Sequence, residues 1–198
     1  HSHGDHIGDM DLLGEAFDVP VWGSDYTSRA VHCDRILEDG EVLQLGKQEW
    51  TVLITPGHHP GHVCLLSDAG LVAGDMVAGI GTILIPPGTG DMDVYIEQLE
   101  RLKALEPHLM FPSHGPVIPL PEKTLNYYIK HRMERHQRVL DAVTSGLRTV
   151  SEISIDAYSN TPDAHPGLAQ DQTLAHLLSH ERANRVRRTE QGWIIGDE

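Results

Sequence analysis

Apolar and polar positions alternate over short runs in the first 120 residues, and Gly, Pro and Asp interrupt these runs. This pattern is typical of strands joined by tight turns. Turns at 45–47 and 68–70 predict two hairpins, which pair 41–45 with 49–54 and 63–67 with 71–73. Further strands are expected at 19–22 and 109–111, and short helices at 8–17 and 26–31.

A longer helix is expected after Asp91 or Asp93, either of which could cap its first turn. Its apolar positions Ile96, Leu99, Leu102 and Leu105 share one face, and Glu106-Pro107 should end it. Residues 79–90 before it are rich in Gly and Pro and are predicted to form a loop over a site. Strands and helices in this order indicate an α/β fold.

The pattern changes to helices beyond residue 120. Helical spacing covers 122–145, 150–158 and 167–181, and two short strands, 185–189 and 192–195, follow around Glu190-Gln191. Three helices and a small ribbon are typical of a winged-helix domain. We therefore expect two domains, at 1–120 and 121–198.

Composition narrows the setting of the protein. The 198 residues contain no apolar run of the roughly 20 residues that a membrane helix needs, and no signal-peptide pattern. Cys33 and Cys64 lie outside any Cys-x-x-Cys spacing, which predicts free thiols in a reducing compartment. We expect a cytoplasmic protein with no membrane partner, and the sequence does not predict its oligomeric state.

The net charge of -14 is unevenly distributed. Residues 1–120 carry 5 Lys or Arg against 18 Asp or Glu, and residues 121–198 carry 10 against 11. The second part has two basic clusters. Either these clusters lie on solvated surfaces, or they bind an acidic or polyanionic partner. Their members are Lys123, Lys130, Arg132, Arg135 and Arg138, then Arg182, Arg185, Arg187 and Arg188.

Metal chemistry is indicated by the first six residues, where His1, His3, Asp5 and His6 are crowded together. In an extended segment His1 and His3 share a face and could hold one ion. Gly4 permits a change of direction, after which Asp5 and His6 could reach a second ion.

Three later motifs complete this pattern: 55–62 (Thr-Pro-Gly-His-His-Pro-Gly-His), Gly74-Asp75, and 112–115 (Pro-Ser-His-Gly). In this order they resemble the metallo-β-lactamase superfamily. The resemblance implies one metal on His1, His3 and His62, a second on Asp5, His6 and His114, and Asp75 as the bridge. It implies catalytic roles for Asp5 and Asp75, a supporting role for His58, and an exposed His59.

The resemblance implies an αββα sandwich, a fold in which several strands and a helix normally precede the first motif. We therefore expect further sequence upstream of His1. The C-terminal part resembles that of the β-lactamase-like protein 2 group, whose mitochondrial representative is an endoribonuclease for single-stranded RNA.

Five imidazoles and two carboxylates suit two Zn²⁺ ions and would also accept Mn²⁺ or Fe²⁺. Two such ions can share a water whose pKa falls toward 7, and the resulting bridging hydroxide would attack the substrate. Many true metallo-β-lactamases have Cys or Ser where Asp75 stands, which disfavours antibiotic hydrolysis. His114 follows Asp75 by only 39 positions, which leaves no room for an inserted cap domain.

Two enzymatic hypotheses follow, hydrolysis of RNA phosphodiesters and hydrolysis of a small-molecule thioester of the hydroxyacylglutathione type, and the basic helix favours the first. A hypothesis of another class is an inactive metal-binding module whose winged helix binds nucleic acid. Trp22, Trp50 and Trp193 are expected in the core. The remaining histidines are interpreted as ordinary surface or helix residues: His32, His108, His131, His136, His165, His176 and His180.

Overall fold

A mixed five-stranded sheet forms the centre of the computed structural model, which describes residues 1–196 apart from the side chain of Asp11. The strand order is β3-β4-β5-β6-β7, antiparallel except for the parallel pair β6 and β7. Strands β4, β6 and β7 therefore run in one direction, and their C-terminal ends lie along one edge. The strands are β3 (Val42–Leu45), β4 (Gln48–Ile54), β5 (Val63–Ser67), β6 (Gly70–Gly74) and β7 (Met110–Pro112).

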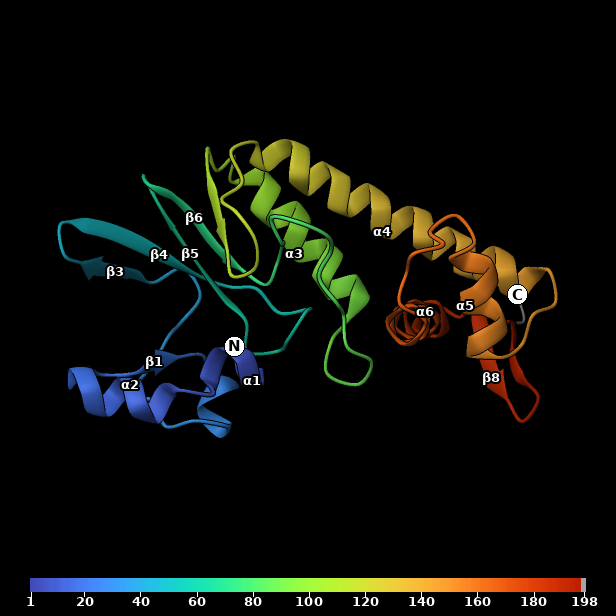
Figure 1. Cartoon of the computed structure of the whole chain (residues 1–198), viewed down its shortest axis with the longest axis horizontal. Coiled ribbons are helices and arrows are strands. Elements are labelled where there is room, and N and C mark those ends of the chain that lie inside the picture. Colours follow the sequence, from blue (N-terminus) through green and yellow to red (C-terminus); the bar gives the residue numbers. More distant parts are fainter. Residues whose placement is uncertain (197–198) are drawn as a thin grey trace.

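Two helices, α3 (Met92–Ala104) and α4 (Pro121–Thr144), cover one face of this sheet (Figure 1). The apolar face predicted for α3 is confirmed for Leu99 and Leu102, which are fully buried in the same cluster as Leu71 of the sheet, but not for Leu105, which follows the helix and is 40% exposed. Asp91 is the N-cap, because its carboxylate accepts from the main-chain N–H groups of Asp93 and Val94. Capping and burial thus fix where α3 lies against the sheet.

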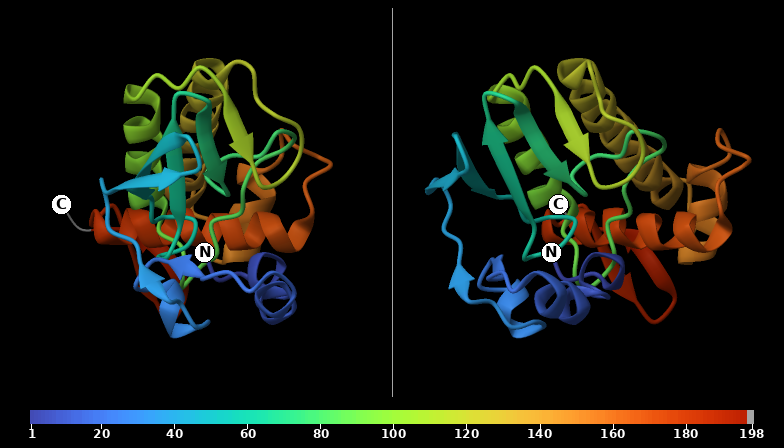
Figure 2. Two further views of the ribbon diagram at one scale, coloured as in Figure 1. Left: turned by 90° about the vertical axis from the view of Figure 1, so that its left-hand side faces the viewer. Right: turned by 60° about the vertical axis from the view of Figure 1, so that its left-hand side comes forward.

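The N-terminal residues lie on the opposite side of the sheet from α3 and α4, as Figure 2 shows. They form α1 (Gly4–Ile7), α2 (Met10–Phe17), β1 (Trp22–Gly23), the 3₁₀ helix η1 (Thr27–Arg29) and β2 (Arg35–Ile36). The strand expected at 19–22 is reduced to β1, which pairs with the two-residue β2. Trp22 is 38% exposed, so its predicted core position is wrong, whereas Trp193 is buried.

The C-terminal elements agree closely with the sequence pattern: α5 (Val150–Ala157), α6 (Pro166–Arg182), β8 (Val186–Thr189) and β9 (Gly192–Ile195). They enclose a second core that contains Ile153, Leu177 and Trp193. Helix α4 reaches from the sheet to these elements (Figure 1), with Leu125 in the first core and Val139 in the second. The winged-helix assignment and the domain boundary at 120 stay predictions.

Two arginines of α4 do not lie on the exposed surface expected from the sequence, although Lys123 and Lys130 of the same helix do. Arg132 and Arg135 are 1% and 4% exposed, and the guanidinium of Arg135 donates to the carbonyl oxygen of Ala157 at the end of α5. Arg138 donates to the same oxygen at 2.7 Å. These arginines satisfy the free carbonyl groups of a helix C-terminus, which explains why they are basic.

Two further expectations can be compared with the structure. Cys33 and Cys64 are both free. Within residues 1–196, no helix has the length and apolar character needed to cross a membrane.

Candidate metal centre

Three strand ends and the N-terminal segment bring the candidate side chains together. His58 lies in the loop after β4, Asp75 directly follows β6, and His114 follows β7 by two residues. Because these ends share one edge of the sheet, the three side chains converge. Asp5 and His6 lie in α1, His3 is the N-cap residue of this helix, and His1 precedes it.

The carboxylate of Asp75 lies at the centre of this cluster. Its Oδ2 atom is within 3.3 to 3.7 Å of the Nε2 atoms of four imidazoles. These belong to His6 at 3.3 Å, His114 at 3.4 Å, His58 at 3.5 Å and His1 at 3.7 Å. A buried carboxylate surrounded by imidazole nitrogens from separate segments is an arrangement that suits cations.

The donor atoms fall into overlapping groups. In each group, one donor atom per residue lies within 4.8 Å of the others. The groups are His1, His3 and His58; then His1, His6 and Asp75; then Asp5, His6 and His114. Six of the seven residues predicted as ligands are therefore brought together, and the seventh, His62, is not in any of these groups.

His58 stands where His62 was expected. Its Nε2 is 3.0 Å from His3 Nδ1 and 3.3 Å from His1 Nε2, while its Nδ1 is 2.7 Å from the carbonyl oxygen of Leu84. A carbonyl oxygen only accepts, so Nδ1 carries the proton and the lone pair of Nε2 faces the cluster. The supporting role that we assigned to His58 is thus inconsistent with its geometry.

His62 has both ring nitrogens occupied by protein partners. Its Nε2 accepts from the main-chain N–H of Asp75 at 2.8 Å, and its Nδ1 lies 2.7 Å from the hydroxyl of Thr55. Gly74 has φ +52°, and a Cβ there would lie 2.5 Å from His62 Nε2. The ring therefore packs against the backbone and holds Asp75 in place, so in this structure it does not join the donor groups, and its assignment as a ligand stays a prediction. The motif 55–62 contains three histidines, and spacing alone could not decide which one faces the site.

Burial favours the neutral form of four imidazoles, those of His3, His58, His59 and His62. It lowers the pKa of His3 and His58, and it lowers the pKa of His62 well below its usual value. His59 is also buried, contrary to our expectation, and burial lowers its pKa to about 4. Neutral imidazole is the form that binds metals, so burial favours ligation here.

Two buried polar atoms of the cluster have no hydrogen-bond partner, Asp75 Oδ1 and His6 Nε2. Buried polar atoms normally find a partner, and such orphans call for an explanation. A divalent cation would satisfy both. The donor set of imidazoles and carboxylates, without a thiolate, also suits zinc, manganese or iron, so the residues fit the implied metals.

The cluster is most exposed to solvent at His114 and Asp5. The side chains of His114 and Asp5 are 50% and 59% exposed, whereas those of His1 and Asp75 are 2% and 6% exposed. Asp5 Oδ2 lies 3.4 Å from His114 Nε2.

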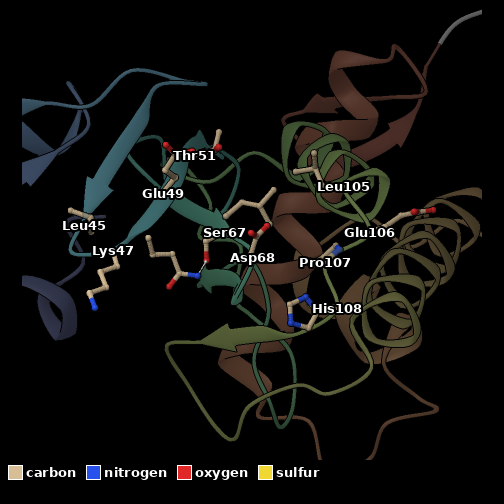
Figure 3. Close-up of a pocket in the computed structure, with 12 residues that line it drawn as sticks. Leu45, Lys47, Glu49, Thr51, Ser67, Asp68, Leu105, Glu106, Pro107 and His108 are labelled. Atoms are coloured by element: carbon tan, nitrogen blue, oxygen red, sulfur yellow. Dashed lines mark hydrogen bonds between the residues drawn. The ribbon is translucent and has the colours of Figure 1, made fainter.

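A groove of about 910 Å³ lies away from the candidate metal centre, between the β3–β4 turn, the β5–β6 hairpin and the end of α3 (Figure 3). Polar and charged side chains line it, including Glu49, Asp68 and His108, and a hydrogen bond of 3.3 Å joins Gln48 to Ser67. None of the candidate ligands lines this groove. We therefore do not assign the candidate site to this groove, despite its volume.

A second group of histidines was not anticipated. His136, His176 and His180 are buried where α4 meets α6, with His136 and His180 stacked at 3.6 Å between ring centroids. His136 Nδ1 is 3.2 Å from His176 Nδ1. Our interpretation of these three as ordinary surface or helix residues is wrong about their burial. His136 and His180 are 44 positions apart on separate helices, so no local spacing could reveal the contact.

The sheet with helices on one face, and a histidine–carboxylate centre at the strand ends, define an α/β protein of the metal-binding hydrolase class. The chain belongs to the metallo-beta-lactamase superfamily, whose family model matches residues 1–114. Members of this superfamily are generally hydrolases that bind divalent metals. The resemblance inferred from the motifs is therefore confirmed.

Relatives extend the similarity beyond residue 114. The chain is 29% identical over 204 residues to a beta-lactamase-like protein 2 homolog of Drosophila melanogaster, covering 94% of this chain and 68% of that protein. It is 34% identical over 130 residues to an atrochrysone carboxyl ACP thioesterase of Paecilomyces divaricatus, covering 64% of this chain and 40% of that enzyme.

Solved structures show the same fold. A beta-lactamase domain protein from Burkholderia ambifaria has a TM-score of 0.72 at 24% identity, covering 82% of this chain and 52% of that one. The protein TTHA1623, solved in a di-iron-bound form, has a TM-score of 0.51 at 29% identity, covering 62% of this chain and 71% of that one. The chain spans about half the length of the Burkholderia protein.

Proposed function

We propose that this chain forms the centre of a dinuclear metal-dependent hydrolase. The observation that carries the proposal is the Asp75 carboxylate, with Oδ2 within 3.3 to 3.7 Å of four imidazoles and Oδ1 buried without a partner. One cation would be held by His1, His3 and His58 and the other by Asp5, His6 and His114, with Asp75 between them. The relative in its di-iron-bound form supports two metals at such a centre.

Each side chain has a definite task in this proposal. Bound divalent cations would supply a lowered pKa for water and polarisation of the substrate oxygen. Burial keeps His58 and His3 neutral, and His62 holds the backbone of Asp75 at the cluster. Asp5, on the exposed side, orients the attacking water and accepts its proton.

The proposed substrate is a thioester. Water oxygen bonds to the carbonyl carbon, the C–S bond breaks, and the products are a carboxylic acid and a thiol. Residues 1–120 carry 18 acidic against 5 basic residues, which repels a polyanion. The arginines of α4 that favoured RNA are used inside the protein, and the Paecilomyces relative is named a thioesterase.

Cleavage of single-stranded RNA becomes the second candidate. Similarity to the Drosophila beta-lactamase-like protein 2 homolog across 94% of this chain supports it, because the sequence resemblance to that group implied an RNA substrate. The exposed basic residue Arg188 in the C-terminal ribbon could contact a phosphate. The substrate test therefore includes RNA.

The test is an assay of zinc-loaded protein against S-lactoylglutathione, a single-stranded RNA and a chromogenic cephalosporin, each with and without chelator. We expect thioester hydrolysis that chelator abolishes and that Asp75→Ala lowers by more than about 100-fold. Asp68→Ala, which removes a carboxylate from an exposed turn, is the control. Cleavage of RNA alone would exchange the two candidates. Metal binding without any hydrolysis would favour the non-enzymatic module.

A further inference from the structure

The loop of residues 79–90 connects the metal centre to the C-terminal helices. On one side, the carbonyl oxygen of Leu84 lies 2.7 Å from His58 Nδ1. This contact selects the tautomer in which Nε2 is unprotonated, and Nε2 then lies 3.5 Å from Asp75 Oδ2. The position of one carbonyl group therefore decides how His58 faces the cluster.

Gln172 of α6 binds the next residue of the loop, Ile85, through both the oxygen and the nitrogen of its side-chain amide. Its Oε1 accepts from the main-chain N–H of Ile85 at 3.2 Å, and its Nε2 donates to the carbonyl oxygen of Ile85 at 2.9 Å. Gln172 and Ile85 are both buried and lie 87 positions apart in the chain. A side-chain amide that pairs with both main-chain groups of one residue fixes the orientation of that peptide.

Arg132 of α4 holds the residue on the other side of Leu84. Its guanidinium donates to the carbonyl oxygen of Ile83, and also to Gln172 Oε1 at 2.6 Å. The side chain is 1% exposed and its guanidinium carbon lies 5.7 Å from the ring centroid of Tyr95. A buried guanidinium is costly unless its donors are used. Both terminal nitrogens of Arg132 bind the loop or Gln172, while its Nε has no hydrogen-bond partner.

The two contacts bracket Leu84. Ile83 is bound by α4, Ile85 is bound by α6, and the carbonyl group between them points at His58. Tyr128, one turn before Arg132 on α4, also donates to the loop, at the carbonyl oxygen of Gly81, at 3.1 Å. Helices α4 and α6 therefore form hydrogen bonds with the loop at Gly81, Ile83 and Ile85.

We propose that Gln172 and Arg132 are positioning residues, which hold residues 83–85 so that Leu84 fixes His58 with Nε2 toward the metal centre. The proposal rests on the proposed function, since it assigns His58 to that centre. It gives the C-terminal helices a role in metal binding that does not require contact with the substrate. It also explains why a chain with this loop places a buried arginine and a buried glutamine on two different helices.

Arg135 provides a matched control. It lies one turn from Arg132 on α4, is also buried, and also donates to a main-chain carbonyl oxygen, but at Ala157 of α5 and not in the loop. Arg135→Met therefore removes a comparable buried guanidinium without releasing residues 83–85. The test variants are Gln172→Met and Arg132→Met. A milder variant, Gln172→Glu, loses the donor to Ile85 but keeps an acceptor beside Arg132.

Two readouts separate positioning from a general loss of stability. The first is the ¹⁵N NMR signature of the His58 ring in metal-free protein at pH 8, which reports its tautomer. The second is the affinity for Zn²⁺ measured by competition with a chromophoric chelator. We expect the variants at 132 and 172 to show a mixture of His58 tautomers and a 10- to 100-fold weaker affinity for Zn²⁺. Arg135→Met should stay within about twofold of wild type in affinity, in keeping with an independent site.

Each outcome decides the proposal. The proposal is overturned if the variants at 132 and 172 keep both the wild-type tautomer of His58 and the wild-type affinity for Zn²⁺. It is also overturned if Arg135→Met has the same effect as Arg132→Met. If the methionine variants fail to fold, Gln172→Glu decides by the same two readouts. If wild-type protein binds no Zn²⁺, the proposed function fails, and the His58 tautomer in metal-free protein still tests the positioning.

Discussion

His58 and His62 occupy one loop and differ in what their second ring nitrogen contacts. The Nδ1 of His58 donates to a carbonyl oxygen, which leaves Nε2 unprotonated and facing three other candidate ligands, His1, His3 and Asp75. The Nε2 of His62 is used by the main-chain N–H of Asp75. Hydrogen bonding therefore makes one residue a candidate ligand and the other a support for Asp75, and the two should respond differently to mutation.

We expect His58→Ala to weaken Zn²⁺ binding by more than about 100-fold, and His62→Ala to weaken it by the 10- to 100-fold typical of a supporting residue. The reason is that His58 would contribute a metal bond, whereas His62 contributes only the position of Asp75. Chelator competition measures both affinities, with His32→Ala on the exposed surface as the control. The reverse order of effects would support the assignment made from the sequence.

These residues also show where sequence reasoning stops. His1, His3, Asp5, His6, Asp75 and His114 converge as the motif order predicted, because each lies at a strand end or in the first segment. His58 was missed because its role depends on the carbonyl oxygen of Leu84, 26 positions away in an irregular loop. A contact of this kind leaves no local periodicity.

At the scale of elements, the apolar spacing predicted α3 to α6 to within a few residues, and the hairpins β3–β4 and β5–β6 as well. Helices and hairpins depend on local contacts, so local patterns are sufficient for them. The arginines of α4 were misread for the opposite reason. Their partners are the C-terminal carbonyl groups of α5 and the loop 79–90, and both are distant in sequence.

The N-cap of α3 gives a prediction at this scale. Asp91 accepts from two main-chain N–H groups of the first turn and pairs with Arg182 of α6 at 2.9 Å. We expect Asp91→Ala to lower the free energy of unfolding by about 1 to 2 kcal/mol, most of it from the lost cap, since the ion pair is half exposed. Urea unfolding measures the change. Glu97→Ala on the exposed side of α3 should be neutral, and an equal loss there would refute the role of the cap.

The interface between α4 and α6 predicts acid sensitivity. Burial lowers the pKa of His136 to about 4, with contributions from His180 and Arg185, while Asp93 acts in the opposite direction. Because the pKa of the folded state lies below the unfolded value near 6.5, the folded state binds fewer protons. Stability is therefore complete above about pH 6.5 and is lost as the pH falls toward 4, by about 3 kcal/mol for this group alone.

The measurement is urea unfolding at pH 7.5 and pH 5.0. We expect His136→Gln to lose less stability between these two pH values than wild type, because it removes the group that must be kept neutral. His32→Gln, at a side chain that is 85% exposed, should behave as wild type. Equal pH dependence in all three proteins would show that His136 is not the sensitive group.

At the scale of the whole molecule, α4 and α6 join the two cores. Ala175 of α6 lies in the first core cluster and Leu177 in the second, and α4 contributes to both. The same two helices bind residues 83 and 85 of the loop that contacts the candidate metal centre. Folding and metal binding should therefore be coupled across the chain.

This coupling gives a prediction for metal removal. A ligand at 100 times its Kd stabilises the folded state by about 2.7 kcal/mol, and 1 kcal/mol shifts the Tm of a domain of this size by about 2 to 4 °C. We therefore expect Zn²⁺ at that excess to raise the Tm by about 5 to 11 °C in a single transition. In the proposed centre, Asp75 Oδ1 and His6 Nε2, which lack hydrogen-bond partners, would gain one from the cation, so Asp75→Asn should remove most of the shift. Calorimetry with and without chelator measures it. Two separate transitions, of which only one responds to Zn²⁺, would show that the C-terminal helices fold independently of the metal centre.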